Sequence, residues 1–109
     1  MTVVMDCNGL QASAYIEDIS SIEPLKAKWE SFGWTVLECS GHDFSELIQS
    51  FERAKATERP TMILARTIKG KGVSLAENNP AWHSRAPKGE EWDKICEEYQ
   101  IRKEELTRL

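Results

Sequence analysis

The sequence lacks the features that would place it in a membrane, on a nucleic acid or outside the cell. No apolar run exceeds five residues, far short of the about 20 that a membrane-spanning helix needs. The first residues have neither the basic region nor the long apolar stretch of a secretion signal. The formal net charge is −4, which gives no basic footprint for nucleic acid. We therefore expect no membrane and no nucleic-acid partner.

Paired cysteines are also absent. The three cysteines, Cys7, Cys39 and Cys96, lie far apart and form no C-x-x-C pair. An odd number without metal-ligand spacing indicates reduced thiols that pack as small apolar groups. A cytoplasmic location is the expectation that follows.

Three short apolar segments have the pattern of buried strands. These are Thr2–Met5, Trp34–Cys39 and Thr61–Ala65, and the third is nearly continuous, as is typical of parallel strands covered on both faces. We expect the first to be a central strand. A chain that opens on such a strand leaves its other side without an obvious cover, which predicts association through strand edges.

Two amphipathic helices are predicted between these strands. Ser20 or Ser21 can cap the first, with Glu23 and Pro24 in its first turn, and Gly33 is placed to end it. Asp43, followed by Glu46, predicts a capping box for the second. The expected apolar faces are Ile22, Leu25, Trp29 and Phe32 in the first helix, and Phe44, Leu47, Ile48, Phe51 and Ala54 in the second.

Strands and helices thus alternate as βαβαβ, for which parallel strands and right-handed crossovers are expected. We expect 11–19 to be a surface connection. Residues 69–86 have no periodicity and are long for a structureless loop, which itself indicates function. A C-terminal helix resumes at Glu90–Tyr99, and its charged end has Leu106 and Leu109 available for packing.

Three places could carry chemistry, and each has a plainer interpretation. Asn8 at the end of the first strand offers an amide oxygen to a hard cation such as Mg²⁺, or it is only a turn residue. The Lys69–Gly72 stretch (Lys-Gly-Lys-Gly) suits phosphate recognition but lacks Walker A spacing, or it is only a solvated basic turn. His83 can orient a ligand or move a proton near neutral pH, or it is a surface residue beside Trp82.

Taken together, ordered motifs from Met1 to about Pro87 resemble the thiamine-diphosphate-binding domain of transketolase, in the form encoded as a separate N-terminal subunit. The motifs are Asp6-Cys7-Asn8-Gly9-Leu10-Gln11, Ser21-Ile22-Glu23-Pro24-Leu25, Phe32-Gly33-Trp34, Gly41-His42-Asp43, Thr67-Ile68-Lys69-Gly70-Lys71-Gly72-Val73-Ser74, Glu77-Asn78-Asn79 and Ala81-Trp82-His83.

This resemblance implies a three-layer α/β/α fold and a cofactor, thiamine diphosphate, held through Mg²⁺ or another divalent cation such as Ca²⁺ or Mn²⁺. By resemblance, Asn8 and the main-chain carbonyl of Leu10 are metal ligands, and Gly9 between them contacts the cofactor. Lys69 and Gly70 belong to the loop over the cofactor. His83 is implied to contact the diphosphate and to assist proton transfer on a substrate hydroxyl.

The implied reaction transfers a two-carbon ketol unit from a ketose phosphate to an aldose phosphate, a reaction of the pentose phosphate pathway. The implied partners are further copies of the chain and the C-terminal, pyrimidine-binding transketolase subunit, giving a dimer or heterotetramer.

Two departures from the family pattern qualify this expectation. The family's Gly-Asp-Gly motif, which supplies the charged metal ligand, should precede Met1. We therefore expect residues 1–109 to be the C-terminal part of the cofactor-binding domain, a truncated βαβαβ unit that is inactive alone. Ala12-Ser13-Ala14 stands where the family often has Ile-Asp-Gly. Two alternatives remain: a non-catalytic assembly module derived from this family, or another thiamine enzyme such as a deoxyxylulose-phosphate synthase.

Overall fold

The computed structural model describes residues 1–108, so the expectation that Leu109 packs lies outside the described residues. The chain divides into two compact units. We call the first, Met1–Gly9 with Tyr15–Thr67, the sheet unit, and the second, Leu10–Ala14 with the chain from Ile68 on, the loop–helix unit. Each is described by itself.

A parallel three-stranded sheet forms the centre of the sheet unit, in the order β1 (Thr2–Cys7), β5 (Thr61–Arg66), β4 (Thr35–Ser40). The parallel pairing expected from the sequence is confirmed, with Thr61 in register with both Thr2 and Thr35.

The expectation that the first strand is central is wrong. β5 occupies the centre, and its residues from Thr61 to Ala65 are all buried. Within the described residues β1 pairs with β5 alone, and the side chains of Val3 and Val4 are 36% and 45% exposed. An apolar β-branched run predicts a strand that can be buried, but it does not predict how many neighbouring strands pair with it.

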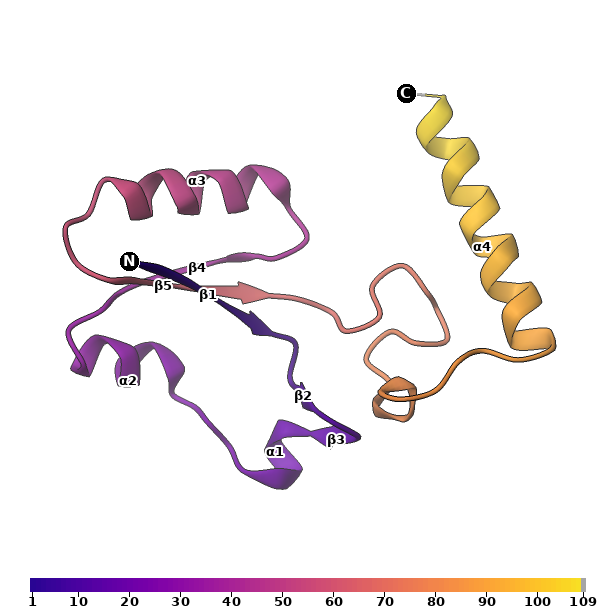
Figure 1. The fold of residues 1–109 in the computed structure, drawn as a ribbon, viewed down its shortest axis with the longest axis horizontal. Helices are drawn as coiled ribbons and strands as arrows, with labels where there is room; N and C mark the ends of the chain where they lie inside the picture. Colours follow the sequence, from indigo (N-terminus) through magenta and orange to yellow (C-terminus); the bar gives the residue numbers. More distant parts are fainter. Residues whose placement is uncertain (109) are drawn as a thin grey trace. The chain divides into compact units, whose positions relative to one another are not determined.

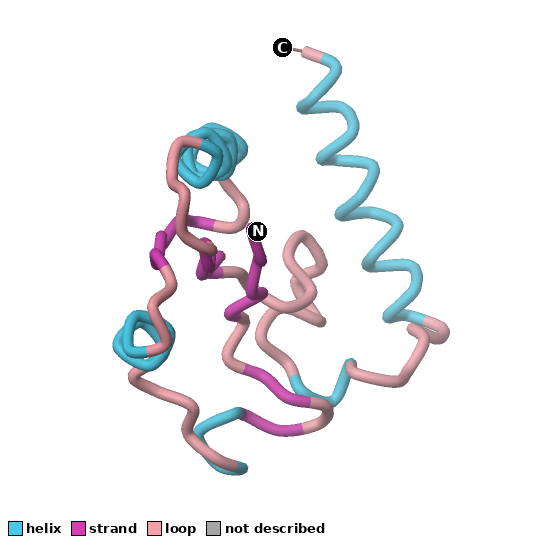
Figure 2. The backbone as a smooth tube through the Cα atoms, turned by 60° about the vertical axis from the view of Figure 1, so that its left-hand side comes forward, coloured by secondary structure: helices cyan, strands magenta, loops and turns pink. Residues whose placement is uncertain are grey.

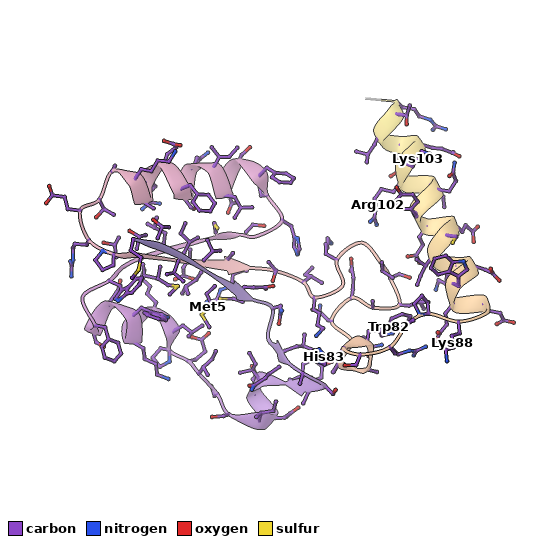
Figure 3. All side chains as sticks on the ribbon, viewed as in Figure 1. Met5, Trp82, His83, Lys88, Arg102 and Lys103 are labelled. Atoms are coloured by element: carbon purple, nitrogen blue, oxygen red, sulfur yellow. The ribbon has the colours of Figure 1, made fainter. Side chains whose placement is uncertain are left out.

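Helices cover both faces of this sheet, as Figures 1 and 2 show, with α2 (Leu25–Ser31) on one side and α3 (Phe44–Lys55) on the other. Side chains of β5 alternate between them: Met62 and Leu64 pack with Leu25, while Ile63 packs in the cluster that includes Leu47. Met5 lies on the α2 side (Figure 3). The three-layer α/β/α architecture is therefore confirmed.

α2 begins later than its sequence pattern predicts. Its first residue is Leu25 and its N-cap is Pro24, so neither Ser20 nor Ser21 caps it. The residue before a proline is disfavoured in helical conformation, and Glu23 instead accepts a hydrogen bond from the Leu25 backbone N–H at 2.8 Å. Its end is as expected, because Gly33 follows with φ of +84°.

α3 has the predicted Asp43 cap but only half of the capping box. Asp43 accepts hydrogen bonds from the backbone N–H groups of Ser45 and Glu46, at 2.8 and 3.1 Å. The Glu46 carboxylate accepts from the Ser40 N–H instead. The buried face is also narrower than predicted, because Ser50 and Ala54 are buried whereas Phe44, Ile48 and Phe51 are exposed.

Removing the α3 cap should destabilise the sheet unit measurably. We expect Asp43→Ala to cost about 1 kcal/mol, because two helix N–H groups lose their acceptor. Asp43→Asn keeps an acceptor oxygen and serves as the matched control, with a change of a few tenths of a kcal/mol. Thermal unfolding followed by circular dichroism measures both. Equal unfolding temperatures for Asp43→Ala and the wild type would contradict the capping role.

The connection after β1 is more regular than expected. A two-stranded ladder forms from β2 (Leu10–Gln11) and β3 (Ala14–Tyr15), followed by the one-turn helix α1 (Ile16–Ile19). The expectation of a surface connection over 11–19 is confirmed, because none of these residues is buried.

The loop–helix unit carries the 3₁₀ helix η1 (Pro80–Trp82) and the long helix α4 (Glu90–Thr107). The expected C-terminal helix is confirmed and continues well past Tyr99. In the part of the chain that the structure describes, no helix is both long and apolar enough to cross a bilayer.

Candidate functional site

The carboxyl ends of the parallel strands meet at one edge of the sheet unit, and hydrogen bonds join them. Asp6 at the end of β1 accepts a hydrogen bond from the Thr67 hydroxyl just beyond β5. The Thr67 N–H donates to the Cys7 carbonyl at 3.5 Å, and the Gly41 N–H donates to the Arg66 carbonyl at 2.7 Å. Ligands of open α/β sheets bind at such an edge.

Asn8 and Gly9 form the turn that leaves β1 at this edge. Asn8 is half-buried, and Gly9 has φ of +74°. The Gly9 carbonyl accepts a hydrogen bond from the Ile16 N–H at 2.9 Å. Because a left-handed φ suits glycine and the carbonyl is engaged, the turn that carries the Asn8 amide is held in place.

A charge network that the sequence did not predict lies on the α2 side of the same edge. The Arg66 guanidinium is 3.5 Å from carboxylate oxygens of both Glu23 and Glu38. The Leu25 N–H, and after it Arg66, lowers the pKa of Glu23. Burial raises the pKa of the Cys7 thiol, which favours its neutral form over the reactive thiolate. The sequence pattern places Glu23 in the first turn of a helix, whereas the helix begins at Leu25 and leaves Glu23 available to Arg66.

In the loop–helix unit, residues 69–78 form a compact Ω loop, a surface loop whose two ends lie together. The Asn78 N–H closes it by donating to the Lys69 carbonyl at 3.0 Å, and the Val73 N–H donates to the Gly70 carbonyl at 3.0 Å. Gly70 has φ of +74°, and a Cβ there would lie 2.6 Å from the Ala76 carbonyl oxygen. The loop therefore requires glycine at this position.

Two of the predicted site residues are brought together in this unit. Lys69 Nζ lies 3.1 Å from Nδ1 of His83, although 14 residues separate them. An ammonium can only donate a hydrogen bond, so with Lys69 charged, Nδ1 is the acceptor and the ring proton of His83 is on Nε2. The pair thus presents a cation and an N–H donor, a combination suited to an anion.

Trp82 lies outside the predicted helices and strands, and its ring makes a defined contact with Arg85. Arg85 stacks on its ring at 4.4 Å from the centroid and pairs with Glu91 in the first turn of α4. Figure 3 shows that Trp82 and His83 lie next to each other at the end of η1. The aromatic ring therefore helps to fix the backbone that carries His83.

The donors that the resemblance implies for a metal are neutral oxygens. Among the described residues no group of three or more His, Cys, Asp or Glu side chains could hold a metal ion. The Asn8 amide and the Leu10 main-chain carbonyl, the ligands implied by resemblance, are both hard neutral oxygen donors of the kind that Mg²⁺ and Ca²⁺ accept. Each is therefore a chemically suitable donor to such a cation when phosphate oxygens supply the negative charge.

A parallel sheet covered on both faces, with an Asn-Gly turn at its carboxyl edge, is an α/β arrangement of the kind that binds ligands at that edge. Residues 1–107 match the family model described as transketolase, thiamine diphosphate binding domain. The chain therefore belongs to the transketolase family, as the sequence motifs predict.

Several relatives are single subunits of transketolases. The chain is 37% identical over 98 residues to one subunit of the apulose-4-phosphate transketolase of Actinobacillus succinogenes, covering 90% of this chain and 36% of that protein. It is 41% identical over 88 residues to the 6-deoxy-6-sulfo-D-fructose transketolase subunit SqwG of a Clostridium species, covering 80% of this chain and 32% of that protein.

A solved structure has the same fold. Transketolase from Campylobacter jejuni superposes with a TM-score of 0.76 at 30% identity, covering 88% of this chain and 15% of that one. The chain thus spans about a third of the single-subunit relatives and a smaller part of the Campylobacter enzyme.

Proposed function

We propose that this chain binds thiamine diphosphate together with a divalent cation and acts as a cofactor-binding part of a transketolase. The proposed reaction moves a two-carbon ketol unit from a ketose phosphate to an aldose phosphate. The observation that carries the proposal is the Asn8-Gly9 turn at the carboxyl edge of a parallel sheet in a chain of this family. When bound, the cofactor supplies the electron sink for carbon–carbon bond cleavage and formation.

For the cation, we assign the Asn8 amide oxygen and the Leu10 carbonyl as ligands, with Gly9 shaping the turn between them. Mg²⁺ is the expected ion because it combines few protein ligands with phosphate oxygens and water; Ca²⁺ and Mn²⁺ are the substitutes. The Gly9 carbonyl, which accepts the Ile16 N–H, supports the assignment of Asn8 because it orients the turn that carries the Asn8 amide.

For the diphosphate and the substrate, we assign Lys69, Gly70 and His83. Lys69 and the Nε2–H of His83 are donors to phosphate or sugar oxygens, and His83 is the proposed proton carrier on a substrate hydroxyl. Their 3.1 Å contact supports a shared role. Gly70 lets the Ω loop fold closely enough to place Lys69 there.

We further propose that a pyrimidine-binding transketolase subunit completes the enzyme, in a dimer or heterotetramer that uses sugar phosphates in the cytoplasm. The names of the single-subunit relatives support an enzyme built from separate chains. All three cysteines are free thiols, as a reducing compartment requires.

Calorimetric titration of the purified chain tests the binding proposal. With Mg²⁺ present, we expect thiamine diphosphate to bind at least about tenfold more tightly than thiamine, because only the diphosphate offers oxygens that can coordinate the cation. Equal affinity for the two ligands would contradict the proposed diphosphate site. No binding of either by a folded sample would mean that further residues or the partner subunit are required for the cofactor, or that the chain is a non-catalytic assembly module.

A further inference from the structure

A carboxylate on α4 receives two hydrogen bonds from a single residue of the Ω loop. Ser74 donates its backbone N–H to Glu98 at 2.9 Å, and its hydroxyl donates to the other oxygen of the same carboxylate. Two donors from one residue into one carboxylate fix both position and orientation, since charge-assisted hydrogen bonds are the stronger kind. These two bonds hold the pKa of Glu98 below its usual range.

The loop makes further contacts around this point. Gly72 donates its N–H to Glu77 at 2.8 Å, and Lys71 pairs with the same carboxylate at 3.5 Å. Arg102 extends from α4 toward the loop (Figure 3), and its guanidinium lies beside Gly72. Glu98 and Arg102 are four residues apart, on neighbouring turns of one helix face. α4 therefore meets the loop over a full turn.

The Ω loop needs contacts from outside the loop to hold one conformation, because its glycines make the backbone flexible. Gly70 and Gly72 both have positive φ, +74° and +96°, and glycine visits many other conformations at little cost. Ser74 lies two residues beyond the second glycine, so a bond there restrains the flexible stretch. Helix α4, with 18 residues, provides the rigid side of this contact.

We propose that Glu98 is a positioning residue: by holding Ser74 it keeps the Ω loop in the conformation that places Lys69 on His83. Its use in catalysis rests on the proposed function, because Lys69 and His83 then serve the cofactor and substrate. The loop-holding role itself is a property of the chain without any ligand.

Amide hydrogen exchange in the whole chain, followed by NMR, tests the loop-holding role directly. In Glu98→Ala, we expect the amides of Val73 and Asn78, which close the loop, to exchange about tenfold faster. Ser74→Ala should weaken the same protection, and it should add little in the Glu98→Ala background because the two residues share one interaction. Ser74→Thr, which keeps the hydroxyl, should preserve the wild-type protection. Glu97→Ala, an exposed neighbour on α4, is the matched control.

Two further readouts separate positioning from general stability. The ring ¹⁵N signals of His83 should shift in Glu98→Ala and keep their wild-type positions in Ser74→Thr, while amides of β5 keep their exchange rates and report an intact sheet. The dissociation constant of thiamine diphosphate should rise by about tenfold in Glu98→Ala.

Unchanged loop exchange in Glu98→Ala, or loop exchange that accelerates without any change at His83, would overturn the proposal. If the wild type binds no cofactor, the proposed function fails, and the exchange and ring signals still decide whether Glu98 positions the loop.

Discussion

Replacing Gly70 with alanine is expected to open the Ω loop. The added Cβ would lie 2.6 Å from the Ala76 carbonyl oxygen and 2.7 Å from its carbon, both backbone atoms. A backbone clash cannot be relieved by turning a side chain, and the φ of +74° adds about 1–2 kcal/mol of conformational cost for an L-residue. We expect the closing bond from Asn78 to Lys69 to be lost and the amide of Asn78 to exchange at least about 100-fold faster, as NMR can measure.

Gly33→Ala separates the clash from the conformational cost. Gly33 also has a positive φ, +84°, but a Cβ there meets only the tip of Arg59 at 3.8 Å. This control should therefore show the conformational cost alone, about 1 kcal/mol at the end of α2. Equal losses of amide protection around Gly70→Ala and Gly33→Ala would contradict the argument from close packing.

Replacing Asn8 with alanine should have the largest effect on ligand binding. On our account this amide oxygen is the only side-chain ligand that the described residues offer to the cation, and an alanine methyl group cannot coordinate. We expect the affinity for thiamine diphosphate in Mg²⁺ to fall at least about 100-fold, since changes even beyond the direct ligands cost 10- to 100-fold. Asn8→Asp is the matched variant: it keeps an oxygen at the same place and adds charge, so dependence on Mg²⁺ should persist.

The sequence predicts the layers of this fold well because the residues in its apolar runs and at its helix ends have, in the structure, the burial and the capping roles that their chemistry favours. The continuous apolar run of β5 is the buried centre of the sheet, and Asp43 and Gly33 begin and end helices as their chemistry requires. The sequence does not predict which side of a helix is buried, because that depends on contacts with residues far away in the chain. Phe44, Ile48 and Phe51 have helical spacing, yet they are exposed in the described structure, because α3 turns the side bearing Ser50 and Ala54 inward.

In the candidate site, too, some features can be predicted from the sequence and others cannot. Asn8 and Gly9 can be found from sequence because an Asn-Gly pair after an apolar strand is a local signal. The contact between Lys69 and His83, and that between Ser74 and Glu98, cannot. Each joins residues across an irregular stretch. The path of that stretch is set by glycine conformations and by backbone hydrogen bonds within the loop, and the hydrophobic pattern of the sequence does not predict either.

Calorimetric titration with thiamine diphosphate, in Mg²⁺ and in EDTA, for the wild type and Asn8→Ala tests directly whether the Asn8 turn holds the cation. We expect the wild type to bind only in Mg²⁺ and Asn8→Ala not to bind, with circular dichroism showing that both chains are folded. Binding of equal strength in Mg²⁺ and EDTA, or unchanged by the Asn8 substitution, would contradict the assignment of this turn as the cation site.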